Sequence, residues 1–329
     1  MIIFNLDENY YTEPKVVAEI GCNHKGDFEI AKEMIKIAKI FCNADVVKLQ
    51  KRNPKELLTP EEYNAPHPNP MHSYGKTYGE HREFLEFTIE QHAELKKYAE
   101  KEMGITYSTS IWDMTSTREV VALNPKLIKI PSACSTYWEM HEYLINNYKG
   151  EIHISTGMTT RKEVEQIVQF YEEKGRAKDV VLYHCTSGYP VPFEETRLLE
   201  IAKFKELYGK RVKAIGFSGH HKGIAIDIAA YTLGAKWIER HFTLDRTWKG
   251  TDHAASLEPD GLRKLKRDLI ATYKSLKFKP DNLLEIEKVQ AKKLRWDRNK
   301  NFKNEWYKKI LISWEFNIEY NMIIYVWKF

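Results

Sequence analysis

Two lysines stand inside short runs of otherwise apolar residues, Lys48 in VVKLQ and Lys129 in LIKIPS. A buried ammonium group costs several kcal/mol unless it is paired or meets a ligand. Two such groups converging beside hydroxyls predict a site for a small anion, a phosphate or a carboxylate. The alternative, lysines that point outward or pair with Glu19 and Glu239, stays open. The hydroxyls on the neighbouring runs are those of Thr109, Ser132, Ser155 and Ser218.

Two histidines, His220 and His241, end consecutive runs of the same kind. At adjoining strand ends their imidazoles could share one divalent cation. Two protein ligands leave coordination positions open, which fits Lewis-acid activation of a substrate oxygen better than a closed structural site. Taken singly, each histidine is equally explained as a hydrogen-bonded core or rim residue. Further candidates that the sequence does not rank are His24, His184, His221 and His253.

Covalent catalysis has weaker support. Cys22, Cys134 and Cys185 lie near the ends of predicted strands, but no Cys-His signature accompanies them. Ser218 in GFSGH lacks the last glycine of the G-x-S-x-G motif, and no acid follows it in triad order. A Schiff-base aldolase built on Lys129 is the more natural rival, although it leaves the two histidines without a role.

These candidate residues need elements that bring them together. Eight β-branched or apolar runs alternate with helical patterns, which is typical of a parallel sheet, and eight is the number of strands in a TIM barrel. An open doubly wound sheet would usually carry a G-x-G-x-x-G loop after its first strand, and EIGCNHKGD is not one. We therefore expect a TIM (β/α)8 barrel. The expected strands are Val16–Asn23, Val46–Gln50, Ile105–Ser110, Leu127–Ser132, Ile152–Gly157, Val180–Ser187, Val212–His220 and Trp237–Thr243.

Helical apolar spacing fills the intervals between these runs. The longest interval, Lys51–Phe87, is too long for an ordinary loop and is rich in proline, so we expect it to fold over the barrel mouth. The alternative is a surface excursion that packs on its own aromatic residues. The expected helices are Phe28–Phe41, Thr88–Met103, Thr115–Leu123, Trp138–Asn147, Arg161–Glu173, Thr196–Tyr208, Gly223–Leu233 and Pro259–Leu276.

Composition narrows the class of protein. The chain has 329 residues, 43% of them hydrophobic, and a net charge of +5, which is typical of a folded globular protein and excludes disordered and collagen-like classes. Basic residues are scattered among acidic ones, so no nucleic-acid partner is expected. The sequence has no signal-peptide pattern and no run near the roughly 18 apolar residues of a membrane span, which predicts a cytoplasmic protein without a membrane partner. Four widely spaced cysteines predict reduced thiols.

The motifs at the strand ends together resemble one family, the N-acetylneuraminate (sialic acid) synthases, whose catalytic part is a TIM barrel. The resemblance runs in order from Val16 to Leu276 and covers every predicted strand. Its motifs are AEIGCNHKGD, VVKLQK, KTYGEH, YSTS, KIPSA, ISTGM, HCTSGYP, GFSGHHKGIAI and LGAKWIERHFTLDRTWKGTDHAASLEP.

The resemblance implies condensation of phosphoenolpyruvate with the open-chain aldehyde of N-acetylmannosamine or a related amino sugar, giving a nine-carbon 2-keto acid and phosphate. It implies Mn²⁺, or Mg²⁺, bound by His220 and His241, with Glu19 handling a proton or water. Gln50 and Asp252 match sugar-facing positions. The positions that match phosphoenolpyruvate contacts are Lys48, Thr109, Lys129, Ser132, Ser155, Ser187, Tyr189 and Ser218.

Two departures from the family pattern affect these expectations. Cys134 stands where many relatives have an acidic residue, so contacts to the sugar are expected to differ. We expect a barrel domain over residues 1–280 and a linker with an atypical tail over 281–329, in place of a complete antifreeze-like domain. The family's homodimer is therefore a weaker expectation, and a catalytically impaired barrel that binds phosphoenolpyruvate or a partner is a second hypothesis.

Overall fold

The computed structural model describes residues 11–296. Eight parallel strands follow one another in chain order around a closed barrel, as the sequence predicted. Each strand begins and ends within two residues of its expected limits. The strands are β1 (Lys15–Gly21), β2 (Val46–Lys51), β3 (Thr106–Ile111), β4 (Leu127–Ile130), β5 (Glu151–Ser155), β6 (Val180–Cys185), β7 (Ala214–Gly219) and β8 (Trp237–His241).

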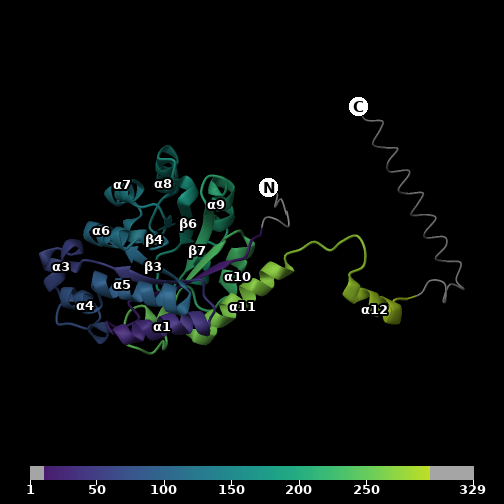
Figure 1. The fold of residues 1–329 in the computed structure, drawn as a ribbon, viewed down its shortest axis with the longest axis horizontal. Helices are drawn as coiled ribbons and strands as arrows, with labels where there is room; N and C mark the ends of the chain where they lie inside the picture. Colours follow the sequence, from purple (N-terminus) through teal and green to yellow (C-terminus); the bar gives the residue numbers. More distant parts are fainter. Residues whose placement is uncertain (1–10, 297–329) are drawn as a thin grey trace, which may run out of the picture. The chain divides into compact units, whose positions relative to one another are not determined.

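Helices connect successive strands and surround the barrel (Figure 1). The helix expected to end at Met103 changes to a π-helical turn after Lys97, and the one expected from Thr196 begins only at Glu200. Arg197 has the left-handed φ of 49°, which interrupts the helical path before it. The helices are α1 (Phe28–Ile40), α5 (Ile89–Lys97), α6 (Met114–Leu123), α7 (Trp138–Asn147), α8 (Arg161–Glu173), α9 (Glu200–Tyr208), α10 (Ala225–Thr232) and α11 (Pro259–Ser275).

Successive side chains on each strand point alternately into the barrel and outward to the helices. Near the amino ends of the strands, Val17, Val46 and Leu127 pack together inside, with Trp237 against them. Residues two positions further along the strands face the same interior, one layer closer to the carboxyl ends. That layer is where the predicted site residues of β1, β2, β4 and β8 lie.

The long segment between β2 and α5 folds over the barrel mouth, as expected. It contains three short helices and touches the loop after β8 at two points. The Tyr74 hydroxyl donates a hydrogen bond to the carbonyl of Lys249, and the backbone N–H of Gly250 donates to His72 Nδ1 at 3.2 Å. Both connected segments therefore border the mouth. The three helices are α2 (Pro54–Leu57), α3 (Pro60–Asn64) and α4 (Tyr78–Phe84).

A buried ionic network lies behind the mouth, on the outer side of β8. The Arg240 guanidinium is ion-paired with Asp227 of α10 and donates to the carbonyls of Gly223 (2.8 Å) and His221 (2.6 Å). Arg240 and Asp227 are at most 1% exposed. Because Arg240 lies between Glu239 and His241, the network fixes the strand that carries both of those site residues.

The chain divides into two compact units at Leu276. The described part of the first, residues 11–276, holds the barrel and its helices, and that of the second, 277–296, holds α12 (Glu285–Leu294). Most of the expected atypical tail, residues 297–329, lies outside the described residues. None of the helices between residues 11 and 296 is long and apolar enough to cross a membrane.

We predict that Asp227→Ala lowers the free energy of unfolding by about 3–5 kcal/mol, because it leaves the Arg240 guanidinium buried without its counter-charge. Urea denaturation measures this change. The matched control is Arg161→Ala, which breaks the exposed Arg161–Glu200 pair and should cost less than about 1 kcal/mol. A loss as small as the control's would show that the buried network does not hold β8.

Candidate active site

Four charged side chains meet inside the barrel. Lys48 Nζ lies 2.8 Å from Glu19 Oε2 and 3.4 Å from Glu239 Oε1. Lys129 Nζ is 2.9 Å from both carboxylate oxygens of Glu239. All four residues are at most 6% exposed. The two lysines converge as predicted, and they do so in the paired arrangement that the sequence left open.

Polar neighbours complete the bonding of this charged layer. Ser218 donates its hydroxyl hydrogen to Glu239 Oε1 at 3.0 Å, and Gln50 Nε2 donates to Glu19 Oε1 at 2.9 Å. Lys48 Nζ also donates to Ser110 Oγ at 3.1 Å, and Lys129 Nζ sits 3.9 Å from the centre of the Tyr183 ring. The ammonium groups are thus held by fixed partners, which suits them to receive an anion without rearranging.

Burial and pairing act against each other in this layer. Burial favours the neutral forms, but Lys129 and Lys48 outweigh it and hold the pKa of Glu239 well below its ordinary range. For Lys48, two carboxylates outweigh burial and raise the pKa. For Lys129, burial lowers the pKa in spite of Glu239. Pairing with the lysines therefore favours the charged form of Glu239, against the effect of burial.

His220 and His241 lie one layer above, at the barrel mouth. Their ring centroids are 5.4 Å apart. His220 Nδ1 is 3.1 Å from the carbonyl of Thr186, so it carries the proton and leaves Nε2 as a free lone pair. Burial lowers the pKa of His220 to about 3, which keeps the ring neutral. His241 Nδ1 is buried without a hydrogen-bond partner and lies 4.0 Å from Asp252 Oδ2.

These histidines fit a metal ion as donors. Neutral imidazoles with one nitrogen fixed by a carbonyl are typical metal ligands, and the unpartnered Nδ1 of His241 would gain a partner. Within residues 11–296, no group of three or more His, Cys, Asp and Glu side chains forms a metal cluster. His220 and His241 are therefore the candidate donors.

A second polar cluster lies beside the charged layer, between the ends of β4, β5 and β6. The backbone N–H of Gly157 donates to Ser132 Oγ at 3.1 Å, and Ser187 Oγ is buried without a hydrogen-bond partner. A Cβ added at Gly157 would lie 2.4 Å from Ser187 Oγ and 2.6 Å from Ser132 Oγ. Glycine at this position therefore leaves a space between the two hydroxyls that any side chain would fill. A small anion bound by both hydroxyls would need that space.

A cavity of about 210 Å³ opens beside His241. Gln50, Tyr189, His241 and Asp252 line it together with residues of the 51–87 segment and the loop after β8. The Tyr189 ring centre is 4.4 Å from that of His220. The two residues that matched sugar-facing positions thus border one cavity that also reaches a predicted metal ligand.

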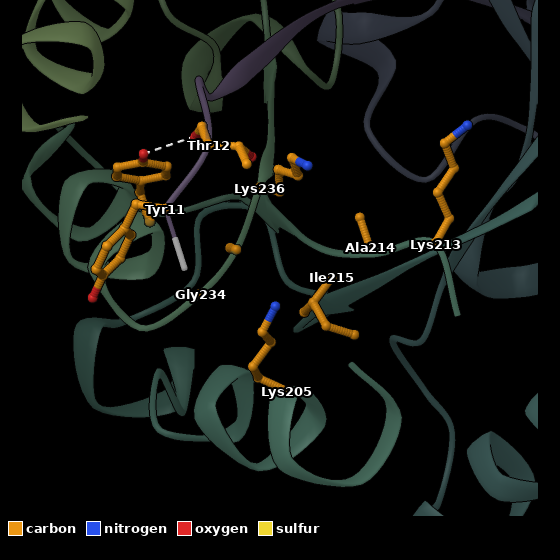
Figure 2. Close-up of a pocket in the computed structure, with 10 residues that line it drawn as sticks. Tyr11, Thr12, Lys205, Lys213, Ala214, Ile215, Gly234 and Lys236 are labelled. Atoms are coloured by element: carbon orange, nitrogen blue, oxygen red, sulfur yellow. Dashed lines mark hydrogen bonds between the residues drawn. The ribbon is translucent and has the colours of Figure 1, made fainter. Parts of the chain in front are cut away.

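A smaller cavity, of about 70 Å³, lies at the amino ends of β7 and β8 (Figure 2). Lys205 extends from α9 toward it, and Lys236 lies on its rim just before β8 (Figure 2). None of the predicted site residues lines it. The chemistry in TIM barrels is placed at the carboxyl ends of the strands, so the 210 Å³ cavity lined by Gln50, Tyr189, His241 and Asp252 is the candidate active site.

The structure places one predicted site residue, Thr109, away from the charged layer. Thr109 shares its strand face with Tyr107 and pairs in register with Ile128, both of which belong to the outer core. Strand alternation therefore turns Thr109 away from the interior, and Ser110 is the residue of β3 that reaches Lys48. Sequence analysis could not settle this, because β3 is buried on both faces. Ser155 closes β5 on the inner face, two residues after His153.

The other chemically active side chains are bonded into the structure. His184 Nε2 donates to the carbonyl of Thr196 at 2.8 Å, and His24 stacks on Phe87 at 4.1 Å between ring centres. His253 Nδ1 contacts Thr243 Oγ1 at 2.7 Å, and His221 belongs to the Arg240 network.

Burial raises the pKa of the thiols, to about 11 for Cys22 and about 12 for Cys134, so neither is an activated nucleophile. The thiol of Cys134 donates to the carbonyl of Trp112 at 3.3 Å.

Comparison with known proteins agrees with this geometry. Residues 34–280 match the model of the NeuB family. The chain belongs to the NeuB family. It is 38% identical over 279 residues to the N-acetylneuraminate-9-phosphate synthase of Homo sapiens, covering 85% of this chain and 76% of that one. It is 34% identical over 251 residues to the N,N'-diacetyllegionaminic acid synthase of Campylobacter jejuni, covering 76% and 73%.

A solved structure has the same architecture as this NeuB-family chain. The N-acetylneuraminic acid synthetase of Leptospira borgpetersenii, crystallised with citrate, superposes with a TM-score of 0.71. The superposition covers 89% of this chain and 94% of that one, at 25% sequence identity. The expected resemblance to sialic acid synthases is therefore confirmed.

We predict that the free energy of unfolding changes less with pH, between neutral and acid conditions, in Glu239→Gln than in the parent chain. Because the lysines hold the folded-state pKa of Glu239 below its unfolded value of about 4.3, its contribution is complete at neutral pH and is lost as pH falls through the folded pKa. The difference in urea midpoint between the parent and the variant should be largest near pH 7. It should shrink as pH falls from about 5 toward 2. Glu139→Gln, at an exposed position of α7, is the control and should show no comparable trend.

Proposed function

We propose that this NeuB-family chain condenses phosphoenolpyruvate with the aldehyde of an amino sugar, releasing phosphate and a 2-keto acid. The observation that carries the proposal is the placement of His220 and His241, whose ring centroids are 5.4 Å apart, one layer above the buried lysines, with His241 on the border of the 210 Å³ cavity. The relatives described above support the same reaction class. Their names include a sugar acid 9-phosphate and an unphosphorylated acid, so they do not decide the acceptor.

Phosphoenolpyruvate would bind deepest, in contact with the charged layer. Its carboxylate and phosphate together need several cationic and hydroxyl partners. Lys48 and Lys129 supply the charge, while Ser132 and Ser187 around Gly157 supply hydroxyls. Burial of these groups excludes water and strengthens each contact. Ser155 and Ser218 face the same interior.

Glu19 is placed to handle the proton or the water that the reaction requires. One of its oxygens accepts from Gln50 and the other faces Lys48 at 2.8 Å, so the carboxylate is fixed in orientation. It is 2% exposed. When C3 of phosphoenolpyruvate bonds to the aldehyde carbon, C2 takes up water before phosphate leaves, and a positioned carboxylate can accept the proton of that water.

His220 and His241 would hold Mn²⁺ or Mg²⁺. When bound, the ion supplies Lewis-acid polarisation of the aldehyde oxygen. The residues of the chain do the rest of the positioning: Gln50, Tyr189 and Asp252 border the cavity that would receive the sugar. Burial acts to raise the pKa of Asp252, but His241, Thr251 and nearby arginines outweigh it and lower that pKa. Asp252 is therefore an acceptor for sugar hydroxyl groups.

The Schiff-base alternative has one point in its favour, the lowered pKa of Lys129. However, its Nζ donates to both oxygens of Glu239, which holds it in the protonated form, and an aldolase gives the two histidines no function. Borohydride treatment with substrate should therefore leave Lys129 unmodified.

The proposal is tested by measuring phosphate release from phosphoenolpyruvate with and without N-acetylmannosamine or its 6-phosphate, in the presence of Mn²⁺. We predict that His241→Ala lowers turnover by about 10²- to 10⁴-fold, since Lewis-acid stabilisation is worth several kcal/mol. His184→Gln, a histidine on the outer face of β6, is the control and should stay within a few fold of the parent. Sugar-dependent phosphate release that survives in His241→Ala would refute the assigned role, and none in the parent chain would support the impaired-barrel hypothesis.

We predict that Gly157→Ala raises the KM for phosphoenolpyruvate at least tenfold while changing the KM for the sugar little. The new methyl group would occupy the space between Ser132 Oγ and Ser187 Oγ. Initial-rate kinetics with each substrate varied in turn measures both constants. Gly261→Ala in α11, where a Cβ meets Leu257 no closer than 3.5 Å, is the matched control. An unchanged phosphoenolpyruvate KM would place the anion elsewhere.

A further inference from the structure

The ammonium group of Lys129 has a second buried neighbour besides Glu239. Its Nζ lies over the Tyr183 ring, 3.9 Å from the ring centre, and Tyr183 is fully buried. The electrons of an aromatic face attract a cation at this distance, and the attraction is stronger where water is excluded. The position of the Tyr183 ring therefore acts directly on Lys129.

A hydrogen bond inside the barrel orients the Tyr183 ring. Its hydroxyl oxygen is 2.9 Å from Nδ1 of His153, which is 1% exposed. His153 pairs in register with Lys129 between β5 and β4, and it packs edge-on against Trp237 with 4.7 Å between ring centres. Burial lowers the pKa of His153. The imidazole is therefore neutral at pH 7 and carries one proton.

Glu151 determines which nitrogen of His153 carries that proton. Glu151 Oε2 lies 3.5 Å from His153 Nε2, and Glu151 Oε1 lies 3.0 Å from Lys213 Nζ. His153 and Lys213 outweigh burial and lower the pKa of Glu151 to about 2, so the carboxylate is ionised. Its charge favours the proton on Nε2, which leaves Nδ1 to accept the hydrogen of the Tyr183 hydroxyl. Donation by that hydroxyl makes the Tyr183 ring richer in electrons and a better partner for a cation.

Gly216 of β7 supplies the space in which the Tyr183 ring lies. The two residues pair in register between β6 and β7. A Cβ added at Gly216 would lie 2.7 Å from both Cδ1 and Cε1 of the ring, so any larger residue would displace it. The backbone of β7 thus fixes one face of the ring, and His153 fixes its hydroxyl end.

We propose that Tyr183 and His153 are positioning residues, which hold the ammonium group of Lys129 where the anion of phosphoenolpyruvate binds. This inference rests on the proposed function, in which Lys129 contacts that anion. Both oxygens of Glu239 lie 2.9 Å from Lys129 Nζ and offset its charge. A third carboxylate would offset it further, whereas a neutral ring fixes the cation and leaves its charge for the substrate.

Initial-rate kinetics with each substrate varied in turn tests this role. Tyr183→Leu removes the ring and should raise the KM for phosphoenolpyruvate at least about tenfold, while the KM for the amino sugar stays within a few fold. Tyr183→Phe keeps the ring face and loses only the hydroxyl, so it should raise the same KM about 2- to 5-fold. Gly216→Ala displaces the ring with its hydroxyl intact. It should raise the same KM, and it decides the question if Tyr183→Leu does not fold.

A double-mutant cycle tests whether His153 acts through Tyr183. His153→Phe removes the acceptor of the hydroxyl and keeps an aromatic ring against Trp237. It should change the KM for phosphoenolpyruvate as Tyr183→Phe does, and the double variant should equal either single one, because both changes break the same bond.

The matched control is Tyr171→Phe in α8. Its hydroxyl is 2.9 Å from His141 Nδ1, and both residues are fully buried. The control therefore loses an equivalent tyrosine–histidine bond outside the barrel interior, and both KM values should stay at the parent level.

The outcomes separate the two proposals. A parent-like KM for phosphoenolpyruvate in Tyr183→Leu and Gly216→Ala would overturn the positioning role and leave the proposed function intact. Equal losses for both substrates, or the same loss in Tyr171→Phe, would show an effect on folding and would overturn it as well.

Isothermal titration of phosphoenolpyruvate without sugar gives a readout that does not depend on turnover. The dissociation constant should follow the order parent, Tyr183→Phe, Tyr183→Leu. A parent chain that binds phosphoenolpyruvate in this order but releases no phosphate with sugar would refute the proposed function and keep the positioning role. A parent chain that does not bind phosphoenolpyruvate would refute both.

Discussion

Pairing of four charges inside the barrel is the constraint on which the rest of the site depends. Lys48, Lys129, Glu19 and Glu239 are at most 6% exposed, and buried charged groups are costly unless they are paired. Lys48 lies 2.8 Å from Glu19, and Lys129 lies 2.9 Å from Glu239. That requirement specifies the register of β1, β2, β4 and β8, because a slip of one residue would turn a charge toward the apolar outer core. The same pairing leaves two ammonium groups fixed beneath the mouth, where an anion can reach them.

The positions of His220 and His241 follow from this layer. His241 follows Glu239 by two residues, and His220 follows Ser218, which is bonded to Glu239, by two. Both histidines therefore stand one layer above Glu239. The residues between them, Arg240 above all, face outward into a second buried network. The inner face of β8 thus carries the candidate site residues Glu239 and His241. Its outer face carries Arg240, whose ion pair with Asp227 holds the strand in place.

The sequence predicts the barrel well because short apolar runs, polar ends and helical spacing are local signals. It also predicts that Lys48 and Lys129 converge, since both lie in strands of one barrel. It does not predict which side of a strand buried on both faces points inward, so it could not show that Ser110, and not Thr109, contacts Lys48. The sequence does not indicate that Arg52 lines the cavity. Its position depends on contacts with Trp112 and Glu86, which only the folded chain brings to it. A basic residue directly after a strand is the one local signal that could have indicated it.

Gln50 connects the two halves of the site. Its Nε2 donates to Glu19 in the charged layer, and the same side chain lines the cavity above. A ligand that took a hydrogen bond from this amide would compete with Glu19 for the donor. The layer below sets two lysines against two glutamates, whereas the cavity above is lined by Arg52, Arg82, Lys249 and Asp252. Gln50 separates these two environments. A ligand in the cavity can therefore change the hydrogen bond that fixes Glu19.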